Sequence, residues 1–143
     1  MGTSSKKDTS MQYVALFEKD KQGYSVTFPD FPLCTTCGET LDEAVDHAHE
    51  ALAMFVEDLV EDGKTLPEPL EKKIIMAQSE NKSKKAIKIS VKGDGTDFEE
   101  FELVMHTHLL EKIEKCCLKN NISPADFLAM AARKALDSDE FVG

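Results

Sequence analysis

The chain has 143 residues, a length that fits one ordinary domain or two small ones. Hydrophobic residues make up 41% of the chain, and tryptophan is absent. No run of about 18 apolar residues exists, so the sequence excludes a membrane-spanning protein and predicts no membrane partner. The formal net charge is −10.

The negative charge is concentrated in one part of the chain. Residues 11–70 hold 13 acidic and 3 basic residues, residues 71–97 hold 4 and 7, and residues 98–143 hold 9 and 5. A strongly acidic domain repels phosphate backbones and attracts basic surfaces. A basic protein is therefore a better partner for residues 11–70 than nucleic acid, with plain solubility as the alternative.

Residues 1–10 are small and polar, and they precede Met11, where the patterned sequence begins. We interpret them as a leader or tag without ordered structure. The four cysteines include the adjacent pair Cys116 and Cys117, and no signal peptide precedes them. This usage predicts reduced thiols and a cytoplasmic protein.

Three strands and a helix are expected first. The run from Val14 to Phe17 predicts a strand over residues 11–18 that is buried on both sides, and alternation predicts a second strand over 24–28, ended by Pro29 and Pro32. Residues 34–37 suit a third strand. Thr40 and Glu43 form a capping box that begins a helix, and Gly63 ends it.

The middle of the chain is polar. Residues 78–97 are expected to be a linker, with a further short strand possible at 73–76 or 86–91. The lysines from Lys82 to Lys88 fit either a nucleic-acid contact or a flexible solubilising segment, and both interpretations remain open. Residues 98–143 then predict a strand over 101–106 and two helices, the second capped by Ser123 and Pro124.

The motifs of residues 11–69 resemble those of HicB-type antitoxins of bacterial toxin–antitoxin systems. They are Gly23-Tyr24, the turn at Pro29-Asp30, Cys34, the segment 38–44 (Gly-Glu-Thr-Leu-Asp-Glu-Ala) and the exit at 66–69 (Leu-Pro-Glu-Pro). Leu33 departs from the glycine usual in the family. The resemblance implies an α+β fold, in which residues 11–77 form a partial RNase H-like domain of antiparallel strands and one helix, without nuclease activity.

The same resemblance implies that the chain is not an enzyme but an antitoxin. Its partner would be a small basic HicA-type ribonuclease toxin that cleaves mRNA, masked by direct contact. We expect the toxin-binding surface to include the sheet, the turn after the second strand and acids of the first helix. Its candidate residues are Tyr24, Pro29, Asp30, Phe31, Asp42 and Asp46.

Residues 98–143 resemble a ribbon-helix-helix module, in which two chains pair their strands, so a homodimer or tetramer is implied. The ribbon core would be Phe101, Leu103 and Met105, and the operator DNA contacts would be Glu102, Val104, His106, Ser123 and Ala125. Phosphates repel Glu102, so DNA binding and autorepression stay open. The alternatives are a stand-alone ribbon-helix-helix transcriptional regulator and a dimerisation module that has lost DNA binding.

Sites for metals, cofactors or catalysis find little support in the sequence. Cys34 and Cys37 have the spacing of a metal knuckle, but zinc needs two further ligands that the adjacent Cys116 and Cys117 supply poorly. Glu43, which with Asp30 and Asp46 could form a nuclease carboxylate set, is already used by the capping box. We therefore predict no metal, no cofactor and no catalytic residue.

Overall fold

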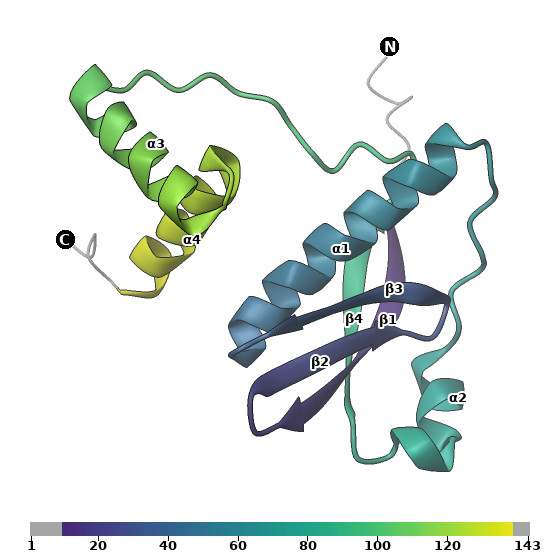
Figure 1. The fold of residues 1–143 in the computed structure, drawn as a ribbon. Coiled ribbons are helices and arrows are strands. Elements are labelled where there is room, and N and C mark those ends of the chain that lie inside the picture. Colours follow the sequence, from purple (N-terminus) through teal and green to yellow (C-terminus); the bar gives the residue numbers. More distant parts are fainter. Residues whose placement is uncertain (1–9, 139–143) are drawn as a thin grey trace. The chain divides into compact units, whose positions relative to one another are not determined.

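The computed structural model describes residues 10–138, which form two compact units that divide after Glu99 (Figure 1). The first unit contains β1 (Ser10–Asp20), β2 (Gly23–Phe28), β3 (Phe31–Gly38), α1 (Leu41–Glu61), α2 (Lys72–Ala77), the short 3-10 helix η2 (Ser79–Asn81) and β4 (Lys85–Lys92). The second unit contains α3 (Thr107–Asn120) and α4 (Pro124–Asp137). No helix in this described range is long and apolar enough to cross a membrane.

The four strands form one antiparallel sheet in the order β3-β2-β1-β4. The central strand β1 is buried on both faces, as its apolar run predicts. Tyr13, Ala15 and Phe17 pack in the main core with α1, whereas Val14 and Leu16 pack on the other face against Ile75 of α2. The sheet therefore has one face covered by the long helix and one face covered in part by the short helix.

Strand β3 is longer than expected. β2 ends at Phe28, just before Pro29, as expected, but β3 already begins at Phe31 and includes Pro32. Proline lacks the backbone N–H that a ladder needs, but β3 is an edge strand of the sheet, where one row of backbone groups has no neighbour to pair with. The position of the strand in the sheet explains why Pro32 is tolerated.

Helix α1 begins and ends where its caps predict. The Thr40 hydroxyl accepts a hydrogen bond from the Glu43 N–H at 3.1 Å, and the Glu43 carboxylate accepts one from the Glu39 N–H at 2.8 Å. At the other end Gly63 has a φ of 71°, and the Lys64 N–H donates to the Leu59 carbonyl at 2.9 Å.

Residues 78–97 were expected to be a linker that could contain a short strand, and they are more ordered than that. Residues 79–81 form η2 and residues 85–92 form β4, whose Ile89 and Val91 are buried in the core. The lysines that alternate with these apolar residues made the segment look like solvated linker. Of the two places considered for a further strand, 86–91 lies in β4 and 73–76 lies in α2.

The second unit is a pair of helices. Ile113 and Cys117 are buried, and Ser123 caps α4 by accepting a hydrogen bond from the Asp126 N–H at 3.0 Å, as expected. The predicted strand over 101–106 is not formed in the single chain, because a strand needs a hydrogen-bonded neighbour and no described residue pairs with it. Of the predicted leader, Ser10 begins β1, and the other nine residues lie outside the described range.

Candidate functional site

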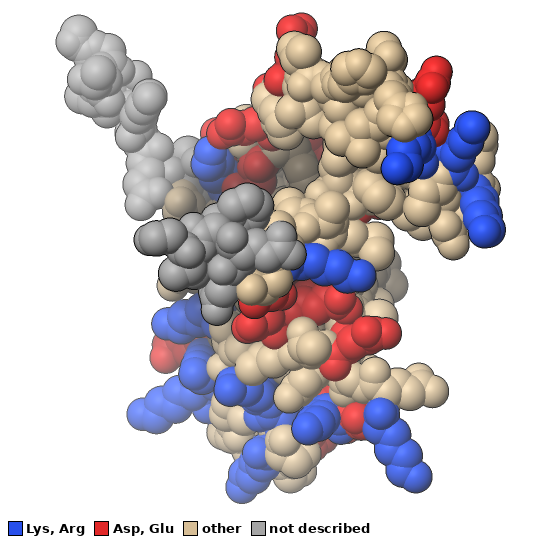
Figure 2. All heavy atoms as spheres, turned by 90° about the vertical axis from the view of Figure 1, so that its left-hand side faces the viewer, with Lys and Arg blue, Asp and Glu red and all other residues tan. Residues whose placement is uncertain are grey.

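The exposed side of α1 is strongly acidic. The helix has 21 residues, and it contains seven acidic residues and neither lysine nor arginine. These are Asp42, Glu43, Asp46, Glu50, Glu57, Asp58 and Glu61. Figure 2 looks at the left-hand side of Figure 1 and shows acidic side chains grouped at the height of the amino-terminal half of α1.

This charge pattern works against the stability of the helix. Asp42 and Asp46 are four residues apart, as are Glu57 and Glu61, and like charges at this spacing repel. The last turn is acidic and contains no basic residue, although the helix dipole favours cations there. Glu43 belongs to the capping box and the dipole favours Asp42, but folding of α1 does not require the other acids, so a role at the surface is the better explanation for those.

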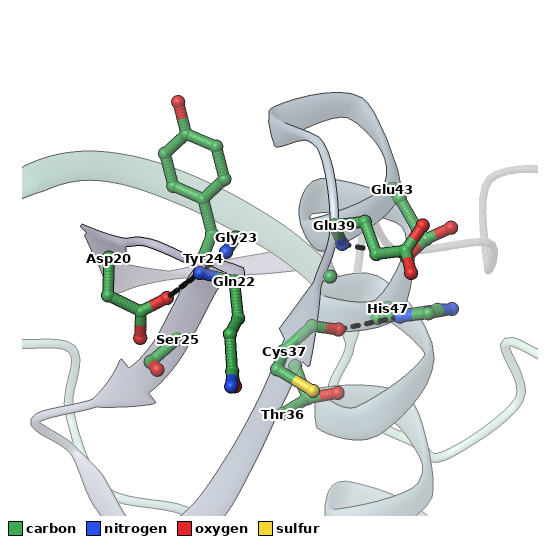
Figure 3. A pocket seen from close by; sticks show the side chains of 11 residues that line it. Asp20, Gln22, Gly23, Tyr24, Ser25, Thr36, Cys37, Glu39, Glu43 and His47 are labelled. Atoms are coloured by element: carbon green, nitrogen blue, oxygen red, sulfur yellow. Dashed lines mark hydrogen bonds between the residues drawn. The ribbon is translucent and has the colours of Figure 1, made fainter.

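A recess of about 810 Å³ lies beside the start of α1 (Figure 3). It is formed by the β1–β2 turn, β2, the end of β3 and the first turns of α1. Its lining includes Asp20, Tyr24, Cys37, Glu39 and Glu43. Asp20 lies on one side of the recess and Glu39 and Glu43 lie on the other (Figure 3), and a lining with these carboxylates suits a cationic side chain.

Hydrogen bonds fix the walls of this recess. The Asp20 carboxylate accepts from the N–H groups of Gln22 and Gly23 at 2.8 and 3.1 Å, which orders the β1–β2 turn. The His47 Nδ1 lies 2.7 Å from the carbonyl oxygen of Cys37. Because a carbonyl only accepts, Nδ1 carries the proton and donates it, and this bond ties α1 to the end of β3.

Two glycines allow the strand ends to approach α1. Gly23 has a φ of 142°, and a Cβ placed there would lie 2.3 Å from the Gly38 carbonyl oxygen. A Cβ on Gly38 would lie 2.5 Å from the backbone nitrogen of Ala44, inside α1. Both positions therefore require glycine, and the shape of the recess depends on them.

The residues predicted to bind a toxin fall into two groups. Tyr24 is partly exposed and lines the recess, while Asp42 and Asp46 are exposed on α1. Phe31 is different: it is 4% exposed and packs edge-on against Tyr13 and Phe55, with ring centroids 4.7 and 5.5 Å apart. Its assignment to a binding surface is wrong, because its side chain is part of the core.

The turn that contains Pro29 and Asp30 holds the segment after α1. Both carboxylate oxygens of Asp30 lie 3.2 Å from the Leu70 N–H, and burial raises the pKa of this carboxyl. Nearby, the Tyr13 hydroxyl donates to the Pro67 carbonyl at 2.7 Å, and burial raises its pKa to about 12. Asp30 thus has a structural task that the sequence analysis did not foresee, and Pro29 beside it is half-buried.

The residues predicted to contact DNA are not brought together in the single chain. Glu102 and Val104 are exposed, and so is Ala125, whereas Ser123 is used as a helix cap. His106 is the N-cap of α3, where its Nδ1 accepts from the His108 N–H at 3.0 Å.

The predicted ribbon core is largely uncovered. Phe101 is 83% exposed and Leu103 is 58% exposed. Leu103 and Met105 line a small recess in the second unit together with Leu110, Ile113, Pro124 and Leu128.

The described residues contain no group of three or more side chains that could hold a metal ion. Cys34 and Cys37 have different surroundings despite their close spacing. Cys34 is buried, which raises the pKa of its thiol to about 11, while Cys37 is exposed at the recess.

The model of the HicB-like antitoxins of bacterial toxin–antitoxin systems matches residues 13–132. The chain belongs to this family. It is 41% identical over 66 residues to an uncharacterized 14.9 kDa protein in the rep-hol intergenic region of Haemophilus phage HP1 (strain HP1c1), a match that covers 45% of this chain and 50% of that protein. It is 38% identical over 60 residues to antitoxin HicB 2 of Photorhabdus laumondii subsp. laumondii, covering 42% and 43%.

The HicB-like chain thus spans half or less of the length of these two relatives. The crystal structure of the Burkholderia pseudomallei antitoxin HicB is similar over more of the chain. It has a TM-score of 0.55 and 28% sequence identity, and the match covers 91% of this chain and 99% of that one. The α+β architecture, with its antiparallel sheet and helices, is therefore shared with a HicB antitoxin.

Proposed function

We propose that this HicB-family antitoxin neutralises a small basic HicA-type toxin by covering the surface with which that toxin binds and cleaves mRNA. The observation that supports this most strongly is α1, whose seven acids stand without a single lysine or arginine along 21 residues. Such a face complements a cationic RNA-binding surface, and like-charge repulsion within the helix is relieved when that surface docks.

The proposed mechanism needs geometry and charge but no catalysis by the antitoxin. Acids of α1 steer the toxin during encounter, and the recess beside Tyr24 receives one of its cationic side chains. Met54, which is 58% exposed between the acids of α1, adds an apolar contact at the centre of the face. Toxin held in this way cannot reach its substrate.

We further propose that the second unit makes the antitoxin a dimer that represses its own operon. Residues 101–106 alternate in the manner of a strand but lack a partner within the described chain, and Phe101 and Leu103 are exposed. A second copy would supply the missing hydrogen bonds and cover both apolar side chains. A larger assembly, such as a tetramer, would need additional contacts.

The steering part of the proposal is tested by reversing charges at matched places. Asp42→Lys with Asp46→Lys reverses two charges in the amino-terminal half of α1, and Glu111→Lys with Glu114→Lys reverses two charges in α3. We expect the first variant to bind the toxin more weakly, mainly through slower association at low salt, and the second to bind normally. Equal effects of the two variants would contradict steering by α1.

A further inference from the structure

The first unit carries a lysine-rich side that the antitoxin function does not use. Seven lysines lie between residues 72 and 92, in a chain whose net charge is −10: Lys72, Lys73, Lys82, Lys84, Lys85, Lys88 and Lys92. Lys72 and Lys73 belong to α2, and Lys85, Lys88 and Lys92 belong to β4. Lys82 and Lys84 lie in the turn between η2 and β4.

Three of these lysines meet at one hollow. Lys72, Lys73 and Lys88 line a recess of about 380 Å³ between α2 and the sheet, together with Gln12, Val14 and residues 69–71. We call these three residues the lysine patch. Lys88 lies opposite Val14 in the β1–β4 register, and Val14 packs against Ile75 of α2, so the patch is on the sheet face opposite α1.

The positive charge of the lysine patch is not balanced by acidic residues around it. Among the described residues the single ion pair of this region joins Lys84 to Glu18 at 4.0 Å, and Glu71 is the one acid that lines the recess. Three exposed ammonium groups around one hollow repel one another. A polyanion would relieve that repulsion and release its own counterions on binding.

The sequence around the patch distinguishes between kinds of polyanion. Residues 70–92 contain no phenylalanine, tyrosine, tryptophan or histidine. Proteins that bind single strands usually stack bases on aromatic side chains, whereas duplex DNA can be held through its phosphates alone. We infer that the lysine patch binds the phosphate backbone of duplex DNA, without reading its sequence, on the face opposite the acidic helix.

This inference does not depend on the toxin. It is tested with the full-length chain and a fluorescently labelled DNA duplex of arbitrary sequence, by anisotropy titrations at several salt concentrations. The variant Lys72→Gln, Lys73→Gln, Lys88→Gln removes the patch. Its control, Lys19→Gln, Lys21→Gln, Lys64→Gln, removes the same charge from exposed positions elsewhere in the unit.

Three phosphate contacts contribute about 2.7 to the slope of log affinity against log salt, which is roughly a 40-fold loss of affinity between about 50 and 200 mM salt. We expect the patch variant to lose this contribution and the control to keep it. A wild-type chain that does not bind the duplex, or equal losses in the two variants, would overturn the inference. The same titrations are repeated with single-stranded RNA of the same length. If the patch variant lost affinity for this RNA but not for the duplex, the inference would also be overturned.

A second readout avoids substitutions altogether. Bound duplex should protect Lys72, Lys73 and Lys88 from acetylation, measured by mass spectrometry, while Lys21 and Lys64 stay reactive. Protection of the patch without any DNA, in step with a larger mass in solution, would instead identify the acidic helix of a second copy as the occupant and overturn the assignment to DNA.

Discussion

Glu61→Gln should make the folded protein more stable. Glu61 is the last residue of α1, an end where the helix dipole disfavours negative charge by about 0.3–1 kcal/mol. It also stands four residues after Glu57, and that like-charge pair costs about 0.2–0.5 kcal/mol. Glutamine has nearly the same helix propensity, so the free energy of unfolding should rise by about 0.5–1.5 kcal/mol.

Asp42→Asn is the matched control at the other end of the same helix. It removes the same charge from the first turn, where the dipole favours it, but it also relieves the repulsion with Asp46. The two effects oppose each other, so the net change lies between about 0.2 kcal/mol of gain and 0.8 kcal/mol of loss. Glu61→Gln should therefore be clearly the more stable of the two variants.

Urea unfolding is the suitable assay because urea is uncharged and leaves the electrostatic effect visible. The gain of Glu61→Gln should be largest at low ionic strength and nearly absent at about 1 M salt, where the screening length is about 3 Å. No gain at low salt, or an equal gain at both salt concentrations, would refute the view that α1 retains its acids at a cost to its stability.

Four further outcomes are expected. Thr40→Ala should lower the free energy of unfolding by about 1 kcal/mol, measured in urea, whereas Thr40→Ser should keep the cap. Burial raises the pKa of Asp30, so this carboxyl contributes most to the free energy of unfolding at pH values below its ordinary pKa, and the contribution falls as pH rises through the raised pKa. Asp30→Asn should therefore gain stability relative to wild type as pH increases, measured by unfolding at several pH values. Gly38→Ala should give a markedly lower Tm, because its Cβ would lie 2.5 Å from backbone of α1, and an unchanged Tm would contradict the close approach. Leu103→Asp should convert the proposed dimer to a monomer in light scattering, and a dimer that persists would exclude residues 101–106 as the pairing segment.

Local signals in the sequence were sufficient for much of the first unit. The capping box at Thr40 and Glu43 identified the start of α1 because it consists of contacts within five residues, and the apolar run of β1 indicated burial on both faces. The resemblance did not predict the recess: of the six residues that it suggested for toxin binding, only Tyr24 lines it. Gly23 and Gly38, which belong to the motifs of the resemblance, prove to be sterically required.

Features set by distant contacts could not be predicted in this way. Phe31 looked like a turn residue, but Tyr13 and Phe55, which are far from it in sequence, enclose it. A strand at 86–91 was considered within an expected linker but not chosen over 73–76, because its pairing with β1 is a contact between distant parts of the chain. The strand expected over 101–106 has no hydrogen-bonded neighbour among the described residues, and its pairing with a second chain is part of our proposal.

The central claim is that this antitoxin masks a small basic ribonuclease. The most direct test is to co-purify the chain with the product of the adjoining small reading frame and to assay RNA cleavage before and after the two are separated. We predict a tight complex without ribonuclease activity and an active partner once the antitoxin is removed. No complex, or a partner that cleaves RNA equally well when bound, would contradict the account.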